Sequence, residues 1–298
     1  MNISGFTYVR NGFTFGYPFI ESISSVLPIV DEMIVVIGDS IDGTKEAIIG
    51  LNDPKIKIID SVWDEESRKN GKIFAQQSNL GIKMLKGKWA LHIQVDEVIH
   101  ENDLKKILKF MELADKRNDI DGLLFPFYHF WGDFNHIRNT RKTHAFEIRA
   151  FKNTGTVFSY KDSQGFRIYP SEDAYYQGNS GKKLRVLNTE VPIFHYSYTR
   201  NPKLMKAKAN FFHRFWHDNR WIDTNTNDAD FDYNDVDQLE DFALPHPSIM
   251  HSTIAQKDWS FIYKPEKSNM KWKDRLLYRF EKISGYRPFS YKNYLLRK

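Results

Sequence analysis

The chain has 298 residues, 41% hydrophobic and 15% aromatic, which is enough apolar material for a buried core and excludes a disordered chain. The absence of cysteine excludes disulfides, thiol nucleophiles and cysteine-ligated metal sites. Residues 271–298 carry nine basic and two acidic side chains against a whole-chain charge of +5, so the rest is net acidic and we expect no nucleic-acid partner.

The N-terminal sequence MNISGFTYVRNG lacks the basic start and the apolar run of a signal peptide. No segment approaches the roughly 20 apolar residues that a membrane-spanning helix needs. We therefore expect a cytoplasmic location, or peripheral attachment to the inner face of the membrane.

The first 120 residues alternate strand-like and helix-like segments. Apolar and β-branched runs predict strands over residues 3–9, 32–37, 55–59 and 89–95. Amphipathic segments predict helices over residues 17–27, 45–51, 71–85 and 103–114, the last capped by Asn102. This alternation implies right-handed crossovers, so we predict an α/β fold with a mostly parallel, Rossmann-like sheet flanked by helices.

The pattern changes after residue 120. Strands are predicted over residues 122–130, 144–151 and 191–196, and a helix over residues 202–217. Seven aspartates within residues 223–241 predict an exposed acidic excursion, and residues 271–298 interleave aromatic with basic side chains. We therefore expect a binding and catalytic domain over residues 1–220, followed over residues 221–298 by an acidic loop and a helical, basic, aromatic extension.

Polar clusters follow the predicted buried strands. Asp96 and Glu97 come directly after the strand over residues 89–95, at the edge where ligands bind in parallel sheets. A carboxylate placed there can hold Mg²⁺ or Mn²⁺ by oxygen ligation. The alternative is that Asp96 caps the following turn and Glu97 is solvated. The turn Gly38–Thr44 lies at the same edge, where it either contacts a ribose or is a plain strand-to-helix connection.

In combination, several segments resemble the family-2-like glycosyltransferases of the GT-A fold. The matching segments span about residues 3–200 and are, in order, ISGFTYVRNG, DEMIVVIGDSIDGT, GKIFAQQSNLGIKMLKGKWALHIQVDE, EIRAFKN and HYSYTRNP. None is specific alone, but their order and spacing are specific jointly. The resemblance implies a transferase that uses a nucleotide sugar and a divalent metal.

The resemblance also implies roles for particular residues. Those expected to bind the nucleotide are Phe6, Thr7, Arg10, Asn11, Asp39 and Gln94. Asp96 is the implied ligand of Mn²⁺ or Mg²⁺, because Gln94–Glu97 occupy the place of the family's Asp-X-Asp motif. Here the first aspartate of that motif is Gln94, whose amide cannot neutralise a cation. His195 is therefore the candidate for a second ligand, with a packed histidine as the alternative.

An inverting transfer needs a general base near the acceptor hydroxyl. Asp162 is our preferred candidate, because the polar, glycine-containing run SYKDSQGFR resembles an acceptor-side loop. Glu147 and Asp173 are the other candidates, and the Glu172–Asp173 pair matches the letters of a pair that the family often shows.

The expected activity is transfer of a sugar, from UDP by frequency within the family, to a glycan or a lipid-linked, lipopolysaccharide-like acceptor. The alternative is a non-catalytic nucleotide- or glycan-binding relative of the same fold. Residues 271–298 predict either an interfacial helix that contacts anionic lipid or a helix packed on the catalytic domain.

Overall fold

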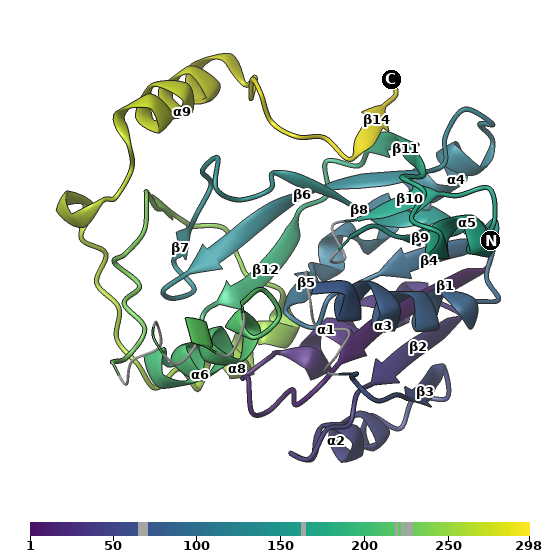
Figure 1. Cartoon of the computed structure of the whole chain (residues 1–298), viewed down its shortest axis with the longest axis horizontal. Coiled ribbons are helices and arrows are strands. Elements are labelled where there is room, and N and C mark those ends of the chain that lie inside the picture. Colours follow the sequence, from purple (N-terminus) through teal and green to yellow (C-terminus); the bar gives the residue numbers. More distant parts are fainter. Residues whose placement is uncertain (65–70, 162–164, 218–219, 222–223, 225–228) are drawn as a thin grey trace.

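One extended sheet runs through the computed structural model, which describes residues 1–64, 71–161, 165–217, 220–221, 224 and 229–298 (Figure 1). Its first part is parallel and consists, in spatial order, of β3 (Ile56–Asp60), β2 (Glu32–Ile37), β1 (Ile3–Val9) and β4 (Trp89–His92). The sheet then continues through β8 (Phe146–Lys152), β6 (Gly122–Trp131), β11 (Lys182–Asn188), β10 (Phe166–Ile168) and β9 (Val157–Ser159). The predicted α/β fold class is confirmed.

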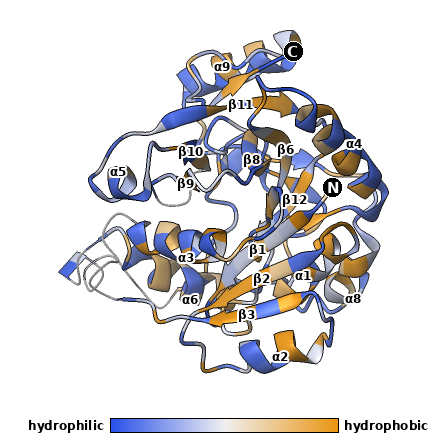
Figure 2. Ribbon diagram, turned by 90° about the vertical axis from the view of Figure 1, so that its right-hand side faces the viewer, coloured by the Kyte–Doolittle hydropathy of each residue, from blue (hydrophilic) through white to orange (hydrophobic). Residues whose placement is uncertain are grey.

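Helices cover both faces of the parallel strands. They are α1 (Phe19–Val26), α2 (Thr44–Gly50), α3 (Lys72–Lys83) and α4 (Leu104–Asp115). Val35 and Ile37 of β2 pack in one apolar core with α1 and α4, whereas Ile34 and Val36 pack in another with Ile82 of α3. Because successive strand residues point to opposite faces, both faces of β2 are apolar from Met33 to Ile37, and the strand is mostly orange in Figure 2.

The strand predicted over residues 89–95 is shorter than expected, since β4 ends at His92. The next residues form a turn in which the Glu97 amide donates to the Gln94 carbonyl (2.9 Å), and β5 (Glu97–Ile99) follows. Helix α4 also begins later than expected. The 3₁₀ turn Glu101–Asp103 precedes it, and the His100 side chain caps that turn by accepting from the Asn102 amide. The prediction that Asn102 caps the helix was therefore wrong.

The remaining elements extend this framework. Strand β12 (Ile193–Tyr198) pairs with β5 and β6, and α6 (Pro202–His213) follows it. The shorter elements are η1 (Leu27–Ile29), β7 (His136–Ile137), α5 (Glu172–Tyr176), β13 (Glu240–Asp241), η4 (Ser248–Met250), α8 (His251–Ala255) and η5 (Pro265–Lys267). Helix α9 (Trp272–Ser284) and β14 (Tyr294–Leu296) complete the chain, and β14 pairs in parallel with β11.

The acidic segment is only partly the exposed excursion that its composition predicts. Within it, Val236 and Leu239 join an apolar cluster with Trp131. The buried Asp237 accepts hydrogen bonds from Arg138 Nε (2.7 Å) and Thr140 Oγ1 (2.6 Å). These partners compensate the carboxylate for its lost hydration, which the count of acidic residues does not reveal. The domain division at residue 220 stays a prediction.

None of the helices in the described part of the chain has both the length and the apolar character that crossing a bilayer requires.

Candidate active site

An open cavity of about 540 Å³ lies where β1 and β4 end. Val9 and Arg10 line it from the end of β1, and residues 94–96 line it from the turn after β4. Helix α6 contributes Lys208, Phe211 and Phe212 to its wall. The carboxyl edge of the parallel strands therefore carries the cavity, as the topology predicts.

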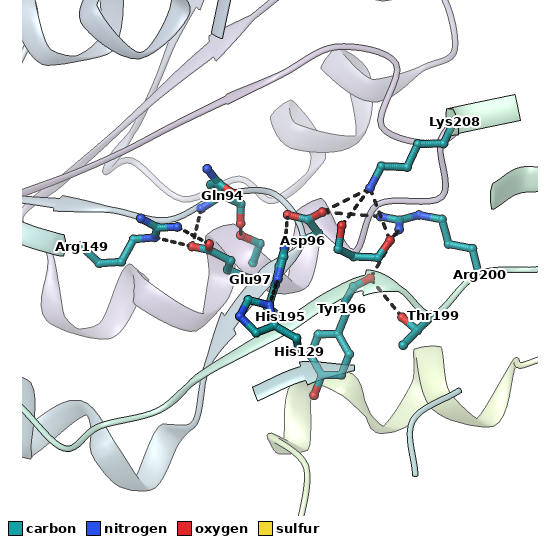
Figure 3. A network of polar contacts seen from close by, with 12 residues as sticks. Gln94, Asp96, Glu97, His129, Arg149, His195, Tyr196, Thr199, Arg200 and Lys208 are labelled. Carbon is teal, nitrogen blue, oxygen red and sulfur yellow. Dashed lines mark hydrogen bonds and ion pairs between the residues drawn. The ribbon is translucent and has the colours of Figure 1, made fainter. Parts of the chain in front are cut away.

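The Asp96 carboxylate is surrounded by three basic side chains (Figure 3). Its Oδ1 lies 3.6 Å from His195 Nε2, and its Oδ2 lies 3.5 Å from Lys208 Nζ and 3.9 Å from Arg200 Nη2. Burial opposes the charge of this carboxylate, but attraction to His195, Lys208 and Arg200 holds the Asp96 pKa well below its ordinary range. Asp96 is therefore anionic at neutral pH and is the centre of a polar cluster.

Lys208 is a buried lysine on the inner face of α6. Its Nζ lies 3.1 Å from Ser197 Oγ and 4.8 Å from the ring centroid of Tyr17. Burial and the neighbouring Arg200 lower the Lys208 pKa to about 7. Arg200 donates through Nε to the Gly16 carbonyl (3.0 Å), while its buried Nη2 has no hydrogen-bond partner within the described ranges. The Lys208 ammonium and the Arg200 guanidinium both suit an anionic ligand, because such a ligand would compensate them for their lost hydration.

A chain of hydrogen bonds sets the orientation of His195. His129 Nε2 lies 2.7 Å from the His144 carbonyl, and His129 Nδ1 lies 2.7 Å from His195 Nδ1. A carbonyl can only accept, so His129 Nε2 donates. Burial and repulsion by His195 lower the His129 pKa to about 3, which leaves its Nδ1 as an acceptor. His195 Nδ1 must then donate, and its Nε2, facing Asp96, is left to carry either a proton or a lone pair for a metal ion.

Glu97 is fully buried rather than solvated. Arg149 binds it through two hydrogen bonds, Nη2 to Oε1 (2.6 Å) and Nε to Oε2 (2.8 Å). The same Oε2 accepts a hydrogen bond from the backbone amide of Gln94 (3.1 Å). The ion pair therefore shapes the turn that presents Asp96, and the alternative in which Glu97 is solvated is excluded.

The residues expected to bind the nucleotide fall into two groups. Arg10 and Gln94 line the cavity, and Asp39 binds Arg10 Nη2 (2.7 Å) at its margin. Phe6 and Thr7 are buried in the sheet and do not line it; the ring of Phe6 stacks on His92 instead.

Asn11 connects two loops at this edge of the sheet. Its backbone φ is positive (51°), its Oδ1 accepts from the Ile41 amide, and its own amide donates to Ser40 Oγ. The structure therefore places Asn11 as a brace between the turns that follow β1 and β2.

The structure does not bring Glu147 or Asp173 to Asp96. Glu147 lines a separate cavity of about 560 Å³ between β8 and the C-terminal segment. Asp173 is exposed on α5. Asp162 lies outside the described residues. Of the predicted set, Asp96, His195, Gln94 and Arg10 therefore share one cavity.

Several residues in or beside the cavity escaped the sequence analysis. Arg200 lies within the matching segment HYSYTRNP, which was a usable signal. No feature of the sequence marks Lys208, because Lys203 and Lys206 in the same helix look equivalent to it. An aromatic cluster also forms here, and all its members except Phe215 line the cavity: Trp63, Phe74, Phe211, Phe212 and Phe215.

The described residues contain no group of three or more metal-ligating side chains. Asp96 and His195 nevertheless offer one oxygen and one nitrogen that face each other in the cavity, with the Gln94 amide nearby. Such a pair suits Mn²⁺ when a ligand's phosphate oxygens complete the shell. The residues present thus fit a metal held jointly with the substrate.

The parallel sheet and the cavity at its carboxyl edge define an α/β protein of the GT-A type. The chain belongs to glycosyl transferase family 2, whose family model matches residues 17–173. Comparison with proteins of curated function gives no match.

Solved structures with low overall similarity include S. aureus TarS, at 13% identity and a TM-score of 0.42, covering 71% of this chain but only 39% of TarS. TarS 1–349 in complex with UDP-GlcNAc gives 13% identity and a TM-score of 0.39, with coverage of 72% and 66%. Glucosyl-3-phosphoglycerate synthase from Mycobacterium tuberculosis was solved in complex with Mn²⁺, UDP and phosphoglyceric acid. It gives 16% identity and a TM-score of 0.36, and the match covers 73% of this chain and 80% of the synthase.

Proposed function

We propose that this chain transfers a sugar from a nucleotide sugar, a UDP-sugar foremost, to a glycan or lipid-linked acceptor with inversion and with help from a divalent metal. The observation that carries the proposal is the Asp96–His195 pair, which lies at the carboxyl edge of the parallel strands and is flanked by Lys208 and Arg200. We also propose a cytoplasmic location, with the acceptor reached at the inner face of the membrane.

Asp96 and His195 would hold Mn²⁺ or Mg²⁺. The bound ion would neutralise the charge that develops on the departing diphosphate. The hydrogen bond from His195 Nδ1 to His129 keeps the other ring nitrogen directed at Asp96. Removal of the metal should therefore weaken diphosphate binding more than nucleoside binding.

Lys208 and Arg200 supply positive charge from the protein itself. Both lie within 4 Å of Asp96 Oδ2, so a diphosphate bound next to Asp96 would meet them directly. Arg10, held by Asp39 and lying 5.6 Å from the ring centroid of Trp63, would orient the nucleoside. Gln94 would contact the nucleotide from the turn after β4.

Asp162 remains our candidate for the base, ahead of Glu147 and Asp173. We expect Asp162→Asn to lower turnover by about 100-fold or more while nucleotide affinity stays unchanged, because a base acts on the acceptor and not on the donor. Turnover measured with saturating donor tests this. Glu147→Gln and Asp173→Asn are the matched variants, and a large loss in either one with near-normal turnover in Asp162→Asn would move the assignment.

The first test of the whole proposal is calorimetric titration of UDP, GDP, CMP and dTDP, in Mn²⁺ and again in EDTA. We expect one nucleoside diphosphate to bind, more tightly with Mn²⁺. Binding without turnover of any matching donor sugar would favour a non-catalytic relative. Failure of every nucleotide to bind to the folded protein would contradict the proposal.

A further inference from the structure

Helix α9 presents an apolar stripe to solvent, which we call the α9 stripe. It consists of four large side chains, with exposed fractions of 68%, 56%, 49% and 88% for Trp272, Leu276, Phe280 and Ile283. Since each helical residue advances by about 100°, these four lie within an arc of about 80°. Such a concentration of large apolar side chains on one exposed face normally marks an interaction surface.

The opposite face of α9 is attached to the body of the protein. The buried Tyr278 donates its hydroxyl hydrogen to Glu240 Oε1 (2.6 Å), and Lys282 Nζ lies 2.6 Å from the same oxygen. Arg287 Nε donates to Glu281 Oε1 (2.6 Å), and its Nη1 donates to the Thr143 carbonyl. These contacts hold the α9 stripe outward, and the helix lies at the edge of the molecule in both views (Figure 1 and Figure 2).

Exposed cations flank the α9 stripe on both sides. On the helical wheel Lys273 lies beyond Phe280 at one border, while Arg275 and Arg279 lie at the other border. The segment from residue 271 to the C-terminus has nine basic and two acidic side chains, a net charge of +7. The partner must therefore offer both an apolar phase and negative charge.

An anionic lipid bilayer offers both. A second copy of the chain would bring two strongly basic segments together, which their mutual repulsion opposes. A nucleic acid would pair with the cations but leave the apolar stripe in water. We propose that α9 docks the protein on an anionic membrane surface, with the α9 stripe inserted at the headgroup boundary and the flanking cations on the lipid phosphates. This docking does not depend on the activity proposed above.

Flotation of the full chain with lipid vesicles tests the proposal. We expect flotation with vesicles of phosphatidylcholine containing about one third phosphatidylglycerol, and much less with phosphatidylcholine alone. The double variant Leu276→Ser/Ile283→Ser should lower the partition coefficient by about tenfold or more, because it removes half of the α9 stripe. Lys273→Gln/Arg279→Gln should weaken binding to the anionic vesicles only.

The control is Leu113→Ser, which removes a leucine of similar exposure (55%) from α4 and should leave flotation unchanged. Circular dichroism of each variant confirms that it is folded. Absence of flotation, or equal flotation of the wild type and the α9 variant, would overturn the proposal. So would a dimer in solution that the α9 variant dissociates, since the occupant would then be a second copy.

Discussion

Replacing Asp96 by alanine is expected to abolish Mn²⁺-dependent binding of a nucleoside diphosphate, with a loss of about 100-fold or more in apparent metal affinity. In EDTA the same variant should bind the diphosphate at least as well as the wild type. The reason is that Asp96 is an anion beside Arg200, Lys208 and His195, so its removal takes away a carboxylate that repels the phosphate. Calorimetric titration under both conditions measures the two effects.

The expected changes in diphosphate affinity have opposite directions in Mn²⁺ and in EDTA. A general loss of activity would not distinguish a metal ligand from a residue that is needed for folding. Asp96→Asn is the matched control, since it keeps the size of the side chain and one neutral oxygen donor. Lys208→Met should weaken diphosphate binding in both conditions, because it removes a phosphate contact and no metal ligand. If Asp96→Ala weakens binding equally with Mn²⁺ and with EDTA, then Asp96 is not a metal ligand.

Replacing Glu97 by glutamine is expected to destabilise the protein by about 3–5 kcal/mol. The variant leaves the Arg149 guanidinium buried without its anion, at a site where both partners are almost inaccessible to solvent. It also weakens the hydrogen bond that residue 97 accepts from the backbone amide of Gln94, so the turn that presents Asp96 should loosen. Urea denaturation followed by circular dichroism gives the change in the free energy of unfolding.

A double variant separates the loss of the pair from the cost of an unpaired charge. Glu97→Gln/Arg149→Met should recover a large part of the stability, because no buried cation then remains. Asp119→Asn is the matched surface control: its pair with Arg117 is exposed, and its loss should leave the free energy of unfolding nearly unchanged. A cost that small for Glu97→Gln would contradict the structural role assigned to the pair.

Much of the fold was readable from local sequence. Strands β1 and β2 begin and end at the predicted residues, because each is a short, mostly apolar run that is buried on both faces. The end of β4 was misplaced by three residues, since the apolar Ile93 and Val95 continue the run although the backbone has already turned. Local composition encodes which face of an element is apolar, but it encodes the last residue of that element poorly.

The site was predictable only where family segments marked it. The position of Asp96 after a buried strand and of His195 within HYSYTRNP led to both residues. The buried state of Glu97 could not be anticipated, because its partner Arg149 is supplied by another strand. Phe6 was expected at the nucleotide and instead packs in the sheet, since a residue's face depends on the strands and helices around it.

By itself, then, the sequence determined the alternation of strands and helices in the first 120 residues, the family, and the strand end at which Asp96 lies, because these depend on residues adjacent in the chain. The tertiary structure alone decided that Lys208 and Arg200 surround Asp96, that His129 orients His195, and that α9 turns its apolar side outward. Those relations depend on which surfaces come into contact when β12, α6 and α9 pack. The spacing of residues along the sequence does not specify these contacts.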